Sequence, residues 1–225
     1  MADFLQDLPT IWATEKTRAW SGLEGGALAH AISRLGGRSL LVVTPSEKEA
    51  EALAEELRFF GGTAMLLPPD DTRPYDGQSP HPSRPRQRIR ALYALAQGQD
   101  SVIVVPVTAL VLRHLPLQAI QPIASLCVDQ EIDRETMGKS LLAGGYLPVG
   151  RVEDEGSFRF RGDRLDIWPN GAELPVRVEF FDVEVESLRQ FDPETQRSGE
   201  SVEGCVFLPA SELVISEASL QRAGE

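Results

Sequence analysis

Short runs of alternating apolar and polar side chains fill residues 156–191 and predict four β-strands. In the first run, residues 158–161, phenylalanine alternates with arginine, and in the third, residues 176–181, valine and phenylalanine alternate with mostly charged residues. Turn residues separate the strands: Gly162-Asp163, Pro169-Asn170-Gly171 and the residues around Asp182. One side of this sheet can therefore face a core while the other carries charges.

The polar side of the third predicted strand carries Arg177, Glu179 and Phe181, so a phenyl ring stands among charges. Isolated apolar residues on surfaces are ordinary, and one interpretation is that Phe181 packs under a neighbouring loop. The other is that Arg161, Arg177 and Phe181 form one patch on adjacent strands, because arginine and aromatic residues anchor many protein interfaces. The pattern alone leaves both interpretations open.

The first half of the chain, residues 1–117, alternates predicted strands and helices. The predicted elements are helices over 26–35, 46–60 and 85–97, and strands over 39–44, 63–67 and 101–106. Ser46 is the expected N-cap of the second helix, with Glu49 completing a capping box. This alternation predicts an α/β fold with a mostly parallel sheet of the kind used by P-loop proteins.

A phosphate-binding loop is expected before the first helix, where the chain reads SGLEGGALAHAI. Aligned with G-x-x-x-x-G-K-[ST], Ser21 replaces the first glycine, Gly26 matches the second, Ala27 replaces the lysine and Leu28 replaces the hydroxyl residue. The loop would then lack the contacts to the β- and γ-phosphates and to magnesium. We expect a degenerate P-loop that binds no nucleotide. The alternative is that these glycines form a helix-start turn in an unrelated fold.

The composition changes near residue 117, where QAIQPIA reads as a linker. A strand over 123–128, a helix over 133–143 and the strands described above follow, which predicts a smaller α+β domain with an antiparallel sheet inserted into the first fold. We expect domains at 1–117 and 118–209. Residues 210–225 are expected to return to the first domain, with a helix beginning at Ser216.

The 225-residue chain has a net charge of -12, which disfavours a main task of holding nucleic acid. Its one concentrated basic run is Arg84, Arg86, Arg88 and Arg90. Arg86 and Arg90 share a helix face, which is a possible basic face for a phosphate or an acidic surface, although such runs are more often solvated.

The remaining chemistry is sparse. Cys127 and Cys205 have no second ligand at metal-binding spacing, and the three histidines offer no catalytic pairing, so we expect no metal, no cofactor and no catalytic residue. The sequence has no apolar run of about 18 residues and no signal-peptide pattern. We therefore expect a cytoplasmic protein with no membrane partner.

Several motifs carry a family resemblance. They are Arg161-Gly162, Leu165 to Pro169, Arg177 to Phe181, Glu186 to Arg189, and Phe191-Asp192. Together they resemble the small second domain shared by the excision-repair protein UvrB and the transcription-repair coupling factors (Mfd). Residues 66–95 are similar to the first domain of the coupling factors, whereas UvrB would carry an intact P-loop and a tyrosine-rich hairpin there. At Asp182-Val183 the chain departs from the family, in which a Gly-Asp turn is frequent.

The resemblance implies the N-terminal UvrB-like module of a larger coupling factor: a degenerate P-loop domain with an inserted α+β domain. It implies a non-catalytic adaptor that recruits UvrA to RNA polymerase stalled at DNA damage. The ATP-dependent DNA translocase and the contacts with RNA polymerase and double-stranded DNA would lie beyond this chain. The family positions for UvrA binding match Arg161, Arg177 and Phe181, with Arg159 and Glu179 as flanking candidates. A UvrB-like DNA-binding or helicase fragment is the alternative.

Overall fold

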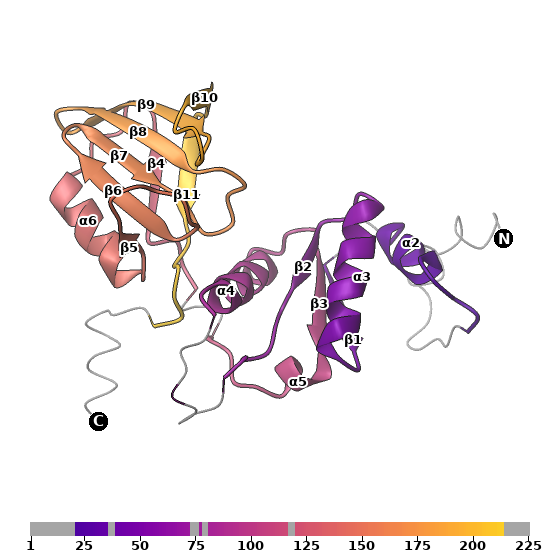
Figure 1. Cartoon of the computed structure of the whole chain (residues 1–225). Helices are drawn as coiled ribbons and strands as arrows, with labels where there is room; N and C mark the ends of the chain where they lie inside the picture. Colours follow the sequence, from indigo (N-terminus) through magenta and orange to yellow (C-terminus); the bar gives the residue numbers. More distant parts are fainter. Residues whose placement is uncertain (1–20, 36–38, 73–76, 78–80, 117–119, 214–225) are drawn as a thin grey trace. The chain divides into compact units, whose positions relative to one another are not determined.

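The computed structural model describes residues 21–35, 39–72, 77, 81–116 and 120–213 (Figure 1). The chain divides into two compact units. The first unit comprises Met1–Pro80 and Ala91–His114, and the second comprises His81–Arg90 and Leu115–Glu225. Each unit has its own secondary structure.

The first unit contains a three-stranded parallel sheet in the order β1-β3-β2. Its strands are β1 (Leu40–Thr44), β2 (Ala64–Leu66) and β3 (Val102–Pro106). Its helices are α2 (Ala27–Ser33), α3 (Glu47–Phe59) and the short α5 (Val107–Leu110). Helix α4 (Ser83–Ala96) begins in residues of the second unit and ends in residues of the first.

Helix α3 follows from its sequence. The Ser46 hydroxyl accepts a hydrogen bond from the Glu49 amide and donates one to the Glu49 carboxylate, so the N-terminal cap is confirmed. The buried side chains recur at helical spacing and form one apolar stripe that packs against the sheet: Ala50, Leu53, Ala54 and Leu57. Every residue of β3 is buried, as expected for the central strand.

The second unit is built on a six-stranded sheet in the order β10-β9-β8-β7-β6-β5. All neighbouring strands are antiparallel except β5 and β6, which run parallel. The strands are β5 (Leu147–Pro148), β6 (Ser157–Arg161), β7 (Arg164–Ile167), β8 (Val176–Phe181), β9 (Glu184–Phe191) and β10 (Ser198–Ser201). A two-stranded sheet pairs β4 (Ala124–Cys127) with β11 (Gly204–Phe207), and α6 (Arg134–Ala143) completes the unit.

One face of the six-stranded sheet packs against α6 and the two-stranded sheet. Its core includes Leu165, Val178 and Leu188 from the sheet, and Met137 from α6. We call the opposite side, which carries the polar residues that alternate with this core, the outer face. The predicted separation of a buried face from a charged face is therefore present in this sheet.

The mixed α/β architecture with a parallel and an antiparallel sheet is confirmed, and each of the ten helices and strands predicted with bounds inside the described residues is present. The short elements β5, β10 and α5 were not predicted. The helix expected from Ser216 lies outside the described residues. The expected domain boundaries stay predictions.

Candidate functional site

The outer face carries all the predicted partner-binding residues, but not on adjacent strands as expected, because β7 separates Arg159 and Arg161 on β6 from the others on β8. Directly opposed residues of antiparallel strands share a face of the sheet. One row across the sheet runs Arg159, Asp166, Arg177 and Arg189, and the next runs Arg161, Arg164, Glu179 and Ser187. Phe181 follows Glu179 by two residues on β8 and lies opposite Glu184. All five predicted residues, Arg159, Arg161, Arg177, Glu179 and Phe181, therefore belong to the outer face.

Phe181 is exposed to solvent. The residue keeps 74% of its surface accessible, whereas the preceding Phe180 is 4% exposed and packs in the core. The turn that follows is made by Asp182 in the left-handed region, with φ of 58°. Aspartate tolerates this conformation better than most residues, so the departure from Gly-Asp still permits a tight hairpin. Packing of Phe181 beneath a loop is therefore excluded.

Arg177 differs from the other four predicted residues, because it is 7% exposed. Its Nε donates to Asp166 Oδ1 at 2.8 Å, and its Nη1 donates to Ser198 Oγ at 2.9 Å and to the Gln196 carbonyl at 3.2 Å. The guanidinium carbon lies 4.7 Å from the centre of the Phe191 ring. The expectation that Arg177 meets a partner directly needs correction, since its donors already bind within the unit.

Asp166 is the anion at the centre of this network. Its side chain is 4% exposed, and Arg164 contacts its second oxygen at 3.2 Å. A buried carboxylate requires such pairing because desolvation of an unpaired charge is costly. Asp166 and Arg164 were not predicted as parts of the site. The cross-strand register would have indicated them, because it puts Asp166 opposite Arg177 and Arg164 opposite Glu179.

The other charged candidates remain accessible. Arg161 and Glu179 are exposed and Arg159 is partly exposed. Ser187 Oγ donates to Glu179 Oε2 at 3.0 Å. Within the part of the chain that the structure describes, neither Arg159 nor Arg161 makes a side-chain hydrogen bond or an ion pair. These two guanidinium groups are therefore available to an external carboxylate.

Two arginines of α4, Arg86 and Arg90, lie against the loop that precedes β6 and the turn after β7. Arg90 Nη1 contacts Glu155 Oε1 at 3.3 Å, and the same oxygen accepts a hydrogen bond from the Gly171 amide at 2.7 Å. The Arg86 guanidinium lies against Gly156, so closely that a Cβ added to this glycine would stand 2.7 Å from it. Both side chains contact residues of their own unit, and their role as a basic face stays a prediction.

Residues 21–28 lie away from the edge where nucleotides bind. Gly26 is the N-cap of α2, and a Cβ on it would meet the Phe60 ring at 3.4 Å. Phe60 ends α3 just before the chain enters β2, so this loop lies beside the amino ends of the strands. Ligands of open α/β sheets bind at the carboxyl ends. The geometry therefore gives no support to the alignment of Ser21, Gly26, Ala27 and Leu28 with a phosphate-binding loop.

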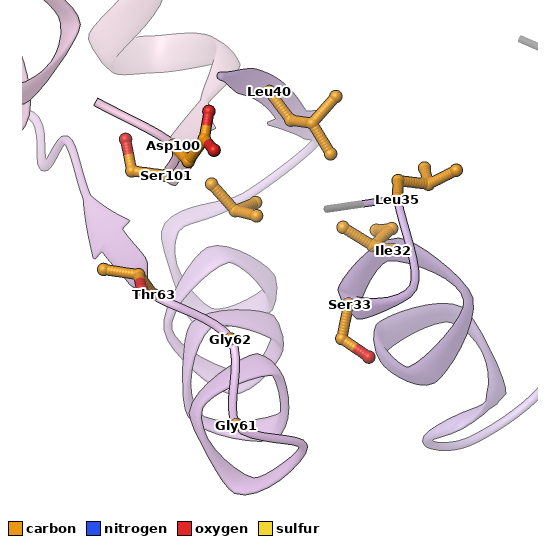
Figure 2. Close-up of a pocket in the computed structure, with 10 residues that line it drawn as sticks. Ile32, Ser33, Leu35, Leu40, Gly61, Gly62, Thr63, Asp100 and Ser101 are labelled. Carbon is orange, nitrogen blue, oxygen red and sulfur yellow. The ribbon is translucent and has the colours of Figure 1, made fainter. Parts of the chain in front are cut away.

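A small cavity of about 190 Å³ opens at the same amino edge. Figure 2 shows it between the C-terminal end of α2 and the residues that begin the three strands, with Leu40, Thr63 and Asp100 among its lining. Its volume is below that of typical small-molecule sites, and Asp100 is its one ionisable lining residue. Across the described ranges no cluster of histidine, cysteine, aspartate or glutamate could hold a metal ion. Nor do these ranges contain a helix of the length and apolar character that a membrane span requires.

Comparison with known proteins gives two findings. The family model of the UvrB interaction domain matches residues 124–213. The transcription-repair-coupling factor of Myxococcus xanthus is 36% identical over 233 residues, covering 98% of this chain and 19% of that protein. The corresponding factor of Escherichia coli (strain K12) is 34% identical over 204 residues, covering 88% and 18%, and that of Haemophilus influenzae is 31% identical over 227 residues, covering 98% and 20%. The chain thus spans about a fifth of the length of these relatives.

Proposed function

The chain belongs to the transcription-repair-coupling factor family as an N-terminal module with a UvrB interaction domain, and we propose that this module recruits UvrA through the outer face of its second unit. In this role it is an adaptor that brings the excision-repair machinery to RNA polymerase stalled at a DNA lesion. We assign the binding of RNA polymerase and DNA, and the ATP-driven motor, to parts of the full-length relatives outside this chain.

The observation that carries the proposal is the exposure of Phe181 on a charged sheet. A phenylalanine residue that is 74% exposed gains from burial in a partner, because apolar area removed from water contributes about 25 cal/mol per Å². Aromatic side chains also lose little conformational freedom when they bind. Phe181 is therefore the proposed anchor of the contact.

In this proposal, the accessible guanidinium groups of Arg159 and Arg161 set the orientation in which the partner binds. Arginine donates two parallel hydrogen bonds to a carboxylate, which fixes geometry as well as adding energy. Glu179 on β8, which is separated from β6 by β7, offers an acceptor to a donor of the partner. Arg177 acts in this proposal as a support, because its bonds to Asp166 and Ser198 tie β8 to β7 and β10.

The test is a calorimetric titration of UvrA with the wild-type chain and with Phe181→Ala. We expect the substitution to weaken binding by about 2 kcal/mol, roughly thirtyfold in Kd, because it removes the central apolar contact. Phe59→Ala is the matched control, since Phe59 is 84% exposed but belongs to the first unit. An unchanged affinity for Phe181→Ala, with Phe59→Ala also unchanged, would remove the outer face from consideration.

A further inference from the structure

The outer face carries a third available cation on a strand that holds none of the positions expected to bind UvrA. Arg189 lies on β9 directly opposite Arg177, so it shares the outer face with the proposed contact residues. It is exposed, and among the described residues its guanidinium has no hydrogen-bond or ion-pair partner. The buried pair of Arg177 and Asp166 thus lies between an accessible arginine on β6 and another on β9.

These cations are not explained by the fold. Asp166, the nearest buried anion in the row, is already bound by Arg177 and Arg164. The chain has a net charge of -12 and therefore many carboxylates, yet none of those in the described residues pairs with the three available arginines. Arg159 and Arg189 stand on strands three positions apart in the sheet, about 14 Å across at the usual strand spacing. That span suits a surface larger than a single carboxylate.

The same face excludes a simple phosphate-binding surface. Exposed Glu179 lies opposite Arg164, and exposed Glu184 lies opposite Phe181. A nucleic-acid backbone presents negative charge uniformly, so it would meet these carboxylates with like charge. A protein surface can place acidic groups against the arginines and other groups against the glutamates, which is the usual form of electrostatic complementarity.

Resting on the proposed function, we infer that the docking segment of UvrA is an acidic protein surface that spans β6 to β9, and that Arg189 is a further contact residue. Phe181 enters an apolar pocket of this surface. Arg159 and Arg161 meet carboxylates on one side of the buried Arg177 and Asp166 pair, and Arg189 meets another on the far side.

The experiment titrates UvrA with Arg189→Glu, Arg189→Gln and the control Lys139→Glu, at low and at physiological salt. Lys139 is exposed on α6, which packs against the core side of the sheet. We expect Arg189→Glu to weaken binding about tenfold at low salt and less at higher salt, with Arg189→Gln intermediate and Lys139→Glu near wild type. Hydrogen exchange of β9 in the free variants checks that the sheet is intact.

Phe181→Ala separates this inference from the function on which it rests. If Phe181→Ala weakens binding while Arg189→Glu matches Lys139→Glu, the face docks UvrA but Arg189 is no contact, and the inference is overturned. If neither variant weakens binding, the proposed function fails as well. A parallel titration measures the affinity of the same variants for duplex DNA. If Arg189→Glu weakens binding to DNA but not to UvrA, the ligand of this face is nucleic acid and the assignment to an acidic protein surface is overturned.

Discussion

Replacing Arg177 with alanine distinguishes a supporting residue from a contact residue. The substitution removes four hydrogen bonds: two to Asp166, one to Ser198 and one to the Gln196 carbonyl. Removing one partner of a buried ion pair typically costs about 3–5 kcal/mol, because the other charge stays buried. Arg164 still contacts Asp166 at 3.2 Å, so we expect the lower end of that range, about 3 kcal/mol of unfolding free energy.

The assay is hydrogen exchange measured by mass spectrometry, combined with urea unfolding. Exchange reports β7 to β10 separately from the first unit, which matters because a chain of two units need not unfold in one step. Arg161→Ala is the matched control, since Arg161 is exposed and unpaired among the described residues, and surface substitutions of this kind stay within about 0.5 kcal/mol.

The opposite pattern would show that Arg177 is a contact residue. If Arg177→Ala unfolds within about 0.5 kcal/mol of wild type and exchanges normally, yet loses UvrA affinity, Arg177 touches the partner and the supporting role is wrong. A double-mutant cycle with Asp166→Ala adds a second criterion. A coupling energy near zero between Arg177 and Asp166 would show that their contact contributes nothing to the sheet.

Two further predictions concern titratable groups in the second unit. Burial raises the pKa of the Cys205 thiol to about 11, whereas Cys127 is exposed. A thiol reagent at about pH 8 should therefore label Cys127 fast and Cys205 slowly, as followed by mass spectrometry. Equal labelling rates for the two cysteines would contradict the structure. Hydrogen bonds from the Thr136 hydroxyl and amide hold the pKa of the Asp133 carboxyl below its ordinary value. The Asp133 cap therefore stabilises α6 fully above the carboxyl's unfolded-state pKa of about 3.9. This stabilisation is lost as the pH falls through the carboxyl's folded-state pKa. Asp133→Asn keeps a side chain that can cap the helix but has no carboxyl group to titrate. On acidification, the unfolding free energy of this variant should therefore fall less than that of wild type. Parallel plots of unfolding free energy against pH for the two proteins would contradict this prediction.

Much of the fold follows from local sequence patterns. Alternation in residues 158–161 and 176–181 predicts β6 and β8, and Ser46 with Glu49 predicts the start of α3. These signals are local, because they depend on side-chain period and on contacts within one helical turn. The strands β5 and β10 escaped prediction for the same reason. β5 has two residues, and every residue of β10 is exposed, so neither carries an apolar alternation.

The candidate site was only partly predictable. Arg161 and Arg177 look alike in sequence, yet Arg177 is enclosed because Gln196 and Ser198, about twenty residues later, accept its hydrogen bonds. Likewise, the pairing of Arg90 with Glu155 depends on a loop 65 residues away. Local spacing predicts which face a side chain occupies, but it does not predict which distant segment covers that face.

The glycine-rich segment illustrates the same limit in the first unit. Residues 21–28 can be aligned with a phosphate-binding loop by spacing alone. The contact between Gly26 and Phe60, however, sets this segment at the amino ends of the strands, and only the tertiary arrangement contains that information. A phosphate-binding function can be assigned to such a motif only when it follows a strand and lies at the carboxyl ends of the sheet's strands.

Site-specific photocrosslinking measures whether Phe181 touches UvrA. A benzophenone amino acid replaces Phe181 in one variant and Phe59, which is also exposed, in the other, and each is irradiated with UvrA. We predict a covalent adduct with UvrA from position 181 and none from position 59. An adduct absent from position 181, or formed equally from both positions, would contradict the account.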